Sequence, residues 1–205
     1  MPGKTREEAL RKAAAKNDAA TIRKLIKEGV NLEARDGAKR TALLIATRAN
    51  AIDAARALID AGANVNAKDN IRDTPYLYAG AEGRLEILRL CLKAGADLTD
   101  TNRYGGNALI PAAHHGHPET VRELLKTKID IDHVNRLGWT ALIEAVILSD
   151  GGPVHQEIVR DLLAAGADPF IADFDGVRPL EHARKRGYAE MVAMLEKAEA
   201  GRKKR

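Results

Sequence analysis

A chain of 205 residues with 45% apolar but only 3% aromatic residues can bury a real core, and Ala and Leu must dominate that core. The formal net charge is +4, and the last four residues, Arg202, Lys203, Lys204 and Arg205, account for all of it, so the body is neutral. These figures favour an all-α, layered protein and argue against nucleic-acid binding by the body, which would need basic residues gathered on one folded face.

The cysteine content and the hydropathy of the chain indicate in which cellular compartment it is expected. Cys91 is the only cysteine, so no intramolecular disulfide can form, and its place between Leu90 and Leu92 predicts a buried position on a helix. The sequence has no run of eighteen apolar residues, and its N-terminal stretch MPGKTREEALRKAAAK lacks the apolar region of a signal peptide. We therefore expect a cytoplasmic protein without membrane contact, unless an export signal has been removed.

An internal repeat organises the chain. The segments TALLIA, TPYLYA, NALIPA, TALIEA and RPLEHA begin at residues 41, 74, 107, 140 and 178, which are 33, 33, 33 and 38 residues apart. A second ladder keeps the same register, with Gly29, Gly62, Gly95, Lys128 and Gly166. A third ladder runs through Asp36, Asp69, Asn102, Asn135 and Asp173. Such self-similarity at a fixed period is typical of stacked repeat architectures.

Each repeat predicts the same series of elements. A polar residue caps a short helix, a turn follows, a longer helix such as LEILRLCLKAG comes next, and an extended segment leads into the next repeat. Glycine after the second helix can take the left-handed conformation that ends it. The predicted repeats cover about residues 5–36, 37–69, 70–102, 103–135, 136–173 and 174–200.

The period of 33 and the quoted TPYLYA and ANVNAKD segments resemble the ankyrin repeat, over about residues 5–198. This resemblance implies an all-α ankyrin-repeat solenoid of about six helix-turn-helix units with hairpin tips, forming a single domain over residues 1–200. A solvated, frayed basic tail, 201–205, would follow it. More narrowly, RYGGNALIPA, GWTALIEAV and the DGG insertion resemble small stand-alone bacterial ankyrin proteins.

Several positions depart from the family pattern. Lys128 stands where glycine normally ends the second helix, at a cost of about 1 kcal/mol if it takes the left-handed conformation. Pro111 lies in the first turn of its helix, and SDGGPVHQ carries five extra residues between the helices of the fifth repeat. Glu, Arg and Lys on the first helix, where other repeats are apolar, are interpreted as the polar outer face of a terminal cap.

The resemblance implies that a partner binds on a concave groove formed by the hairpin tips and one stripe of the first helices. Counting i, i+4, i+7 and i+8 from the capping residue selects the stripe, and the tips add Arg, Tyr and Trp, the residue types that dominate binding hot spots. The predicted partner-binding residues are Tyr78, Glu82, Arg103, Tyr104, His114, His115, Arg136, Trp139, Glu144 and Leu148.

The histidines of AAHHGHP admit other interpretations. His117 matches the turn between the two helices and is interpreted as scaffold. A metal site needs about three ligands at about 2.0 to 2.2 Å, whereas adjacent helical residues such as His114 and His115 point about 100° apart. Catalysis by His114 with Glu144 lacks an evident nucleophile with a fixed base. A small-molecule or metal-dependent site around Tyr78, His114, Glu144 and Trp139 stays the alternative.

Trp139, the only tryptophan, has two interpretations that the sequence does not separate. Its ring either covers the neighbouring hairpin against Tyr104 or stands exposed as an anchor for a partner. The prediction as a whole is a monomeric, non-catalytic protein-protein interaction module without a cofactor, which binds a protein or peptide partner. Nucleic-acid contact would be confined to the tail.

Overall fold

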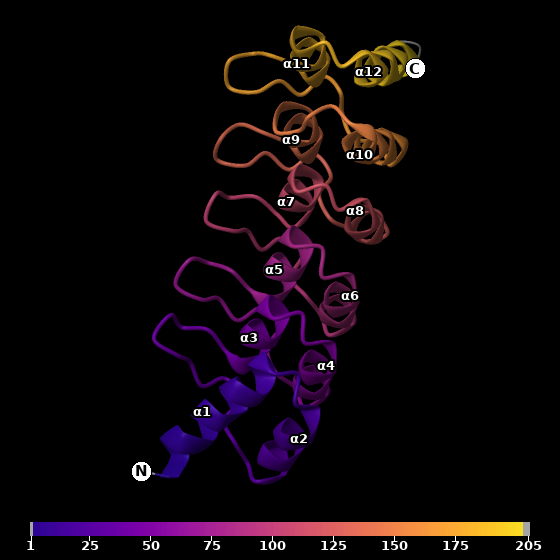
Figure 1. The fold of residues 1–205 in the computed structure, drawn as a ribbon. Helices are drawn as coiled ribbons and strands as arrows, with labels where there is room; N and C mark the ends of the chain where they lie inside the picture. Colours follow the sequence, from indigo (N-terminus) through magenta and orange to yellow (C-terminus); the bar gives the residue numbers. More distant parts are fainter. Residues whose placement is uncertain (1, 203–205) are drawn as a thin grey trace. The chain divides into compact units, whose positions relative to one another are not determined.

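The computed structural model describes residues 2–202, with side chains from Thr5 onward; residues 203–205 of the predicted tail lie outside the described residues. All regular elements of this part are helical, and short first helices alternate with second helices along the chain (Figure 1). None of these helices has the length and apolarity that crossing a bilayer requires. The helices are α1 (Pro2–Ala15), α2 (Ala19–Lys27), α3 (Ala42–Arg48), α4 (Ile52–Asp60), α5 (Pro75–Ala81), α6 (Leu85–Lys93), α7 (Leu109–His114), α8 (Pro118–Leu125), α9 (Ala141–Ile147), α10 (Pro153–Ala164), α11 (Pro179–Arg186) and α12 (Ala189–Arg202).

The predicted threonine N-caps are confirmed, whereas α7 has Ala108 at its N-cap. Side-chain oxygens of Thr41, Thr74 and Thr140 each accept a hydrogen bond from the backbone N–H three residues later, at 3.3, 3.0 and 3.2 Å. Each bond satisfies a donor that the start of a helix leaves without an intrahelical partner. These three threonines therefore fix where α3, α5 and α9 begin.

The predicted glycine stops are confirmed as well, with one exception. Gly29, Gly62, Gly95 and Gly166 have φ between 74° and 102°, the region that only glycine enters without strain. Lys128, in the fourth slot, is absent from the residues with positive φ. There the hydroxyl of Thr127 accepts from the N–H of Ile129 at 3.2 Å instead. The cost considered for a left-handed lysine therefore does not arise.

The chain divides into two compact units. The N-terminal unit comprises the residues up to Ala79 together with Arg84–Arg103, and the C-terminal unit comprises Gly80–Gly83 and the chain from Tyr104 onward. The division therefore falls at three places in the sequence: within α5, just before α6, and between Arg103 and Tyr104. The predicted single domain over residues 1–200 stays a prediction.

The core of the N-terminal unit lies between its helices. α1 packs against α2 and α3, while α4 packs against α2 and α6. Leu10, Leu43, Leu58 and Cys91 are essentially inaccessible to solvent there. The predicted burial of Cys91 is confirmed, and this burial raises the pKa of its thiol to about 12, which makes the thiol unreactive at neutral pH.

The C-terminal unit repeats this arrangement. First helices contact first helices (α7 with α9, α9 with α11), and second helices contact second helices (α8 with α10, α10 with α12). Fully buried leucines of both rows, among them Leu109, Leu124, Leu142 and Leu195, form the core. The loops before α9 and α11 project on the side of the first helices (Figure 1).

The insertion in the fifth repeat is held by the sixth. The ring of Tyr188 lies against Gly151, where an added Cβ would come within 2.4 Å of it, and the Tyr188 hydroxyl donates to the carbonyl of Ser149 at 2.7 Å. The side-chain amide of Gln156 donates to the carbonyl of Gly151 at 2.8 Å. The extra residues therefore form an ordered turn that leads into α10.

The prediction of a frayed tail is wrong for its first two residues, since α12 runs on to Arg202. The guanidinium of Arg202 donates to the carbonyls of Gly166 and Ala167, the latter at 3.1 Å, and pairs with Asp168 at 3.1 Å. The sequence shows only a run of basic residues here. It does not reveal that the Arg202 side chain reaches backbone acceptors 35 and 36 residues earlier in the chain. Arg202 thus joins the last helix to the turn after α10.

Arg202→Ala is expected to lower the free energy of unfolding by about 1 kcal/mol, since it removes two charge-assisted hydrogen bonds and a partly exposed ion pair. Urea denaturation followed by circular dichroism measures the change. Lys197→Ala, on an exposed part of the same helix, is the control and should change little. Equal stability of the two variants would contradict the anchoring role of Arg202.

Candidate functional site

The predicted partner-binding residues fall in both units. Tyr78 and Arg103 belong to the N-terminal unit. The other eight belong to the C-terminal unit and lie on its hairpins, on α7 and α9, and at the helix ends; they are Glu82, Tyr104, His114, His115, Arg136, Trp139, Glu144 and Leu148.

Glu144 is the least exposed of these residues, with 6% of its surface accessible. Its Oε1 accepts a hydrogen bond from the side-chain amide of Asn135 at 2.9 Å, and Asn135 is itself 5% exposed. The Asn135 Oδ1 accepts from the backbone N–H groups of Leu137 and Trp139 at 2.9 and 3.1 Å. Asn135 therefore ties the hairpin before α9 to the carboxyl group of that helix.

The last repeat has the opposite pairing at the same separation. There, nine residues again separate the partners, and His182 Nε2 donates to Asp173 Oδ2 at 2.6 Å. Asparagine thus takes the slot of the aspartate, and glutamate takes the slot of the histidine. The donor and the acceptor have exchanged sides, so the hydrogen bond is retained in the fifth repeat.

Burial raises the pKa of Glu144 to about 7, although the hydrogen bond from Asn135 acts in the opposite direction. The nearest imidazole nitrogen, Nδ1 of His114, lies 3.6 Å from Glu144 Oε2. Desolvation, together with the neighbouring His115 and His155, lowers the pKa of His114. Both shifts favour the uncharged forms, so this contact is weaker than an ion pair between two charged groups.

Two neighbouring histidines, His115 and His155, bind backbone carbonyls. His115 Nδ1 donates to the carbonyl of Ala81 at 2.6 Å, and His155 Nε2 donates to the carbonyl of His114 at 2.9 Å. The ring of His117 lies against Gly83, which agrees with its interpretation as scaffold. The hydrogen bond of His115 gives it a structural role that the sequence did not reveal, so a substitution there is not a clean probe of binding.

Within residues 5–202, the structure contains neither a preformed metal site nor a reactive thiol. No three His, Cys, Asp or Glu side chains of this part converge as a metal site requires. Tyr78 belongs to one unit, while His114, Glu144 and Trp139 belong to the other. Cys91, the one thiol, is buried with a raised pKa.

An apolar row lies on the hairpin tips of the C-terminal unit. Tyr104, Leu137 and Phe174 occupy three successive tips and are 50%, 46% and 76% exposed. The tips are connected: the N–H of Arg136 donates to the carbonyl of Tyr104 at 2.9 Å, and the Phe174 ring lies against Gly138. We refer to Tyr104, Leu137 and Phe174 as the tip row.

The sequence pattern predicted Tyr104 as a partner-binding residue but not Leu137 or Phe174. A usable signal was present, since each member of the tip row follows a residue of the Asp/Asn ladder by one or two positions. Trp139 is half-buried and Leu148, next to the end of α9, is exposed. The two interpretations of the Trp139 ring both stay open.

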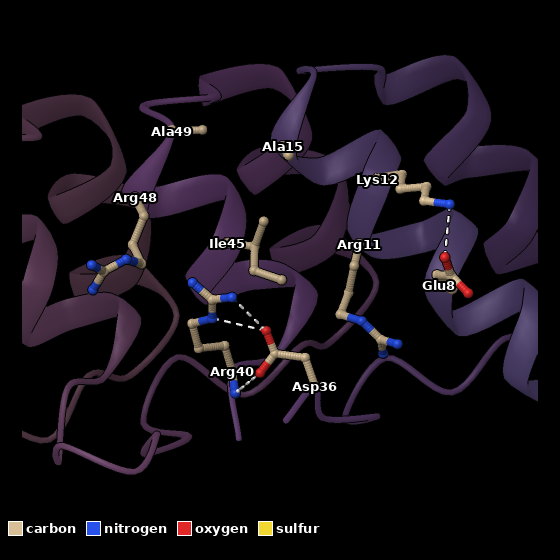
Figure 2. Close-up of a pocket in the computed structure, with 9 residues that line it drawn as sticks. All are labelled: Glu8, Arg11, Lys12, Ala15, Asp36, Arg40, Ile45, Arg48 and Ala49. Carbon is tan, nitrogen blue, oxygen red and sulfur yellow. Dashed lines mark hydrogen bonds and ion pairs between the residues drawn. The ribbon is translucent and has the colours of Figure 1, made fainter. Parts of the chain in front are cut away.

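A hollow that the sequence did not reveal lies in the N-terminal unit and measures about 400 Å³ (Figure 2). Its walls come from α1, from the hairpin before α3, and from α3 itself. The lining residues are Glu8, Arg11, Lys12, Ala15, Asp36, Arg40, Ile45, Arg48 and Ala49. The spacing of residues 8, 11, 12 and 15, at i, i+3, i+4 and i+7, marks one helix face and could have identified this wall. The charged face of α1, interpreted as a terminal cap, therefore lines a hollow.

The chain is similar to known proteins over most of its length. A family model described as "Ankyrin repeats (3 copies)" matches residues 10–102 and 76–173. An ankyrin repeat domain from Acinetobacter baumannii AYE is 56% identical, with a TM-score of 0.91 over 94% of this chain and 98% of that chain. The ankyrin repeat protein EF0377 is 44% identical, with a TM-score of 0.90 over 93% of this chain and 97% of that chain.

Two further relatives are more distant or shorter in their match. The ankyrin repeat domain of Bcl-3, a member of the IkappaB family, is 27% identical, with a TM-score of 0.83 over 92% of this chain and 85% of that chain. The ankyrin repeat protein YahD of Escherichia coli (strain K12) is 48% identical over 52 residues, which span 25% of this chain and 26% of that protein. None of the four relatives named above is described as an enzyme.

Proposed function

Because the chain belongs to the ankyrin repeat family, whose members generally act as protein-protein interaction modules, we propose that it binds a protein or peptide partner and performs no chemistry of its own. The binding surface is the tip row together with the predicted residues on α7, α9 and the hairpins of the C-terminal unit. The protein acts as a cytoplasmic monomer. Its partner engages the exposed side chains of this surface and leaves the backbone of the repeats unchanged.

The observation that carries this proposal is the exposure of the tip row. Tyr104, Leu137 and Phe174 stand at successive hairpin tips, whereas the large apolar side chains of the helices are mostly buried. Apolar side chains grouped at the surface and rimmed by polar residues are typical of interaction sites. Arg136, between two members of the row, adds a residue type that is enriched at binding hot spots.

The described part of the chain offers little support for the alternative, a small-molecule or metal-dependent site. His114 and Glu144 approach one another, but burial raises the pKa of the Glu144 carboxyl, and a metal ion needs an ionised carboxylate and more ligands. The neighbouring histidines already use a ring nitrogen to bind backbone carbonyls. These contacts favour a structural role for the histidine cluster.

Trp139→Ala is expected to weaken binding of the partner by about 2 kcal/mol, or about thirtyfold in Kd, because an aromatic ring at the centre of an interface acts as a hot spot. The partner is first captured by the wild-type chain from a lysate of the organism that encodes it. The Kd is then measured by calorimetry with the purified partner. Leu137→Ser tests the tip row in the same way.

Lys126→Ala, at the end of the second helix α8, is the matched control and should leave the Kd unchanged. Circular dichroism should show all three variants folded, since Trp139 bonds to Asn135 through its backbone N–H and carbonyl. A partner that binds Trp139→Ala and Leu137→Ser as tightly as the wild type would place the interface elsewhere.

A further inference from the structure

The hollow in the N-terminal unit carries more positive than negative side chains. Four cations line it, Arg11, Lys12, Arg40 and Arg48, against two carboxylates. Figure 2 shows three of the four, Arg11, Arg40 and Arg48, around the side chain of Ile45. An apolar floor with a surplus of cations is suited to a ligand that has both apolar and negatively charged groups.

Neighbouring groups already engage both carboxylates. Asp36 Oδ1 accepts from the backbone N–H groups of Ala38 and Arg40, each at 2.9 Å, while its Oδ2 accepts from Arg40 Nε at 2.8 Å. Glu8 pairs with Lys12 at 2.7 Å. Asp36 thus stabilises the hairpin turn and pairs with Arg40, while Glu8 pairs with Lys12 within α1. Arg40 and Lys12 are therefore already paired.

The remaining two cations are the ones that a ligand would meet. Arg11, half-buried on α1, makes no ion pair or hydrogen bond with any residue from 5 to 202, although Glu8 is near enough to interact with its charge. Arg48 lies with its guanidinium 4.5 Å from the centre of the Tyr78 ring and 3.5 Å from Asp73. Stacking on the ring holds Arg48 in place while its remaining donors stay available. This contact also gives Tyr78 a role in the hollow.

The floor between these cations is apolar. It consists of Ala15 at the end of α1, Ile45 on α3 and Ala49, which caps the end of α3. Two alanines and a half-buried isoleucine leave space for an incoming side chain and offer it no hydrogen bond. A ligand that buries an apolar group there would place an adjacent carboxylate beside Arg11 or Arg48, which stand on opposite sides of Ile45 (Figure 2).

We propose that this hollow binds a peptide segment of a partner protein in which an aspartate or glutamate is adjacent to a large apolar residue. An acidic side chain pairs with Arg11 or Arg48, which flank Ile45 (Figure 2), and the apolar side chain lies on Ala15, Ile45 and Ala49. A nucleic-acid backbone would supply the negative charge but no apolar group for the floor. The inference rests on the proposed function only in that the occupant is a protein, since the hollow and the tip row belong to different units.

The test begins with a display library of random twelve-residue peptides, panned against the full chain at low salt. We expect the recovered peptides to be enriched in Asp or Glu next to Leu, Ile or Phe. A labelled synthetic peptide of the most enriched sequence is then measured by fluorescence polarisation. Its Kd should rise at least tenfold with Arg11→Gln/Arg48→Gln, and its counterpart with Asn and Gln replacing the acids should bind equally weakly to both proteins.

A second variant separates the floor from the charges. Ala49→Phe fills the hollow without changing its charge, at an exposed position with ordinary helical φ and ψ, so the fold should be kept and the Kd should again rise at least tenfold. The matched control is Arg23→Gln/Arg56→Gln, which removes two exposed arginines of the same unit that form no ion pair within the described residues. It should leave the Kd within about twofold.

Three results would overturn the inference. Recovered peptides that lack the acidic-apolar pair, or that bind Arg11→Gln/Arg48→Gln and Ala49→Phe as well as the wild type, would do so. If the binding of the recovered peptides is instead lost with Trp139→Ala, the proposed function is supported and the hollow is not the peptide site. A DNA duplex that competes with the peptide at similar affinity would assign the arginines to phosphate binding.

Discussion

Asn135→Asp is expected to lower the free energy of unfolding at pH 8 by about 3 kcal/mol or more, one of the two largest effects predicted for this chain. The substitution converts the donor that faces Glu144 Oε1 at 2.9 Å into a second carboxylate oxygen, at a site where both residues are about 5% exposed. Two buried carboxylates at hydrogen-bond distance cannot both be ionised without a large penalty. Chemical denaturation at pH 8 and pH 5 measures the loss, which should be smaller at pH 5, where a shared proton restores the hydrogen bond.

The last repeat supplies the control. Adding Glu144→His to Asn135→Asp recreates the pairing of Asp173 with His182, at the same nine-residue separation. We expect the double variant to recover at least half of the lost stability, which a double-mutant cycle would register as a favourable coupling. Full stability of Asn135→Asp alone at pH 8 would show that the buried amide does not determine the charge of Glu144.

The second large effect is a pH dependence assigned to Glu144. Its carboxyl group has a pKa of about 7 in the folded chain against an ordinary value of 4.5, so between these values the folded chain holds a proton that the unfolded chain has released. Raising the pH therefore favours unfolding. About 2.5 pH units at about 1.4 kcal/mol per unit give a loss of about 3 kcal/mol, complete above pH 7 and absent below pH 4.5.

Glu144→Gln isolates this contribution from the other carboxyl groups. The difference in unfolding free energy between Glu144→Gln and the wild type should grow by about 3 kcal/mol in favour of the glutamine variant as the pH rises from 4.5 to 8. The polar groups that face the carboxyl, His114 and Asn135, are unchanged in both proteins. Glu119→Gln, at an exposed position on α8, is the control. A constant difference across this range would rule out a raised pKa.

The sequence predicted the fold because the features that define each repeat depend on residues close together in the chain. The all-α ankyrin-repeat fold and the resemblance to bacterial ankyrin proteins are confirmed. Thr41, Thr74 and Thr140 cap their helices as predicted, because a cap depends only on residues within one turn. Cys91 is buried as predicted, since a 3.6-residue period identifies the face of a helix that points inward.

The depth and the partners of individual side chains could not be predicted in this way. Periodicity placed Glu144 on the groove stripe but did not reveal that Asn135 holds it below the surface. Arg202 was interpreted as part of a solvated tail because its acceptors lie 35 and 36 residues earlier in the chain. The hollow beside Arg11 depends on three segments that meet only after folding. Each of these features depends on contacts between residues in different structural elements, and a sequence pattern does not reveal such contacts.

The way the sixth repeat holds the insertion of the fifth limits how this protein can diversify. Arrays of this kind can evolve by duplicating or losing single repeats, provided that each one contacts its neighbours through interchangeable faces. Here Tyr188 fits only a neighbour with glycine at position 151 and a carbonyl at the place of Ser149. A recombination between repeats five and six would separate Tyr188 from Gly151 and Ser149. The Tyr188 ring would then lose its contact, and the inserted turn of the fifth repeat would lose its support. We therefore expect these two repeats to keep their fold in another array only when they are transplanted as a pair.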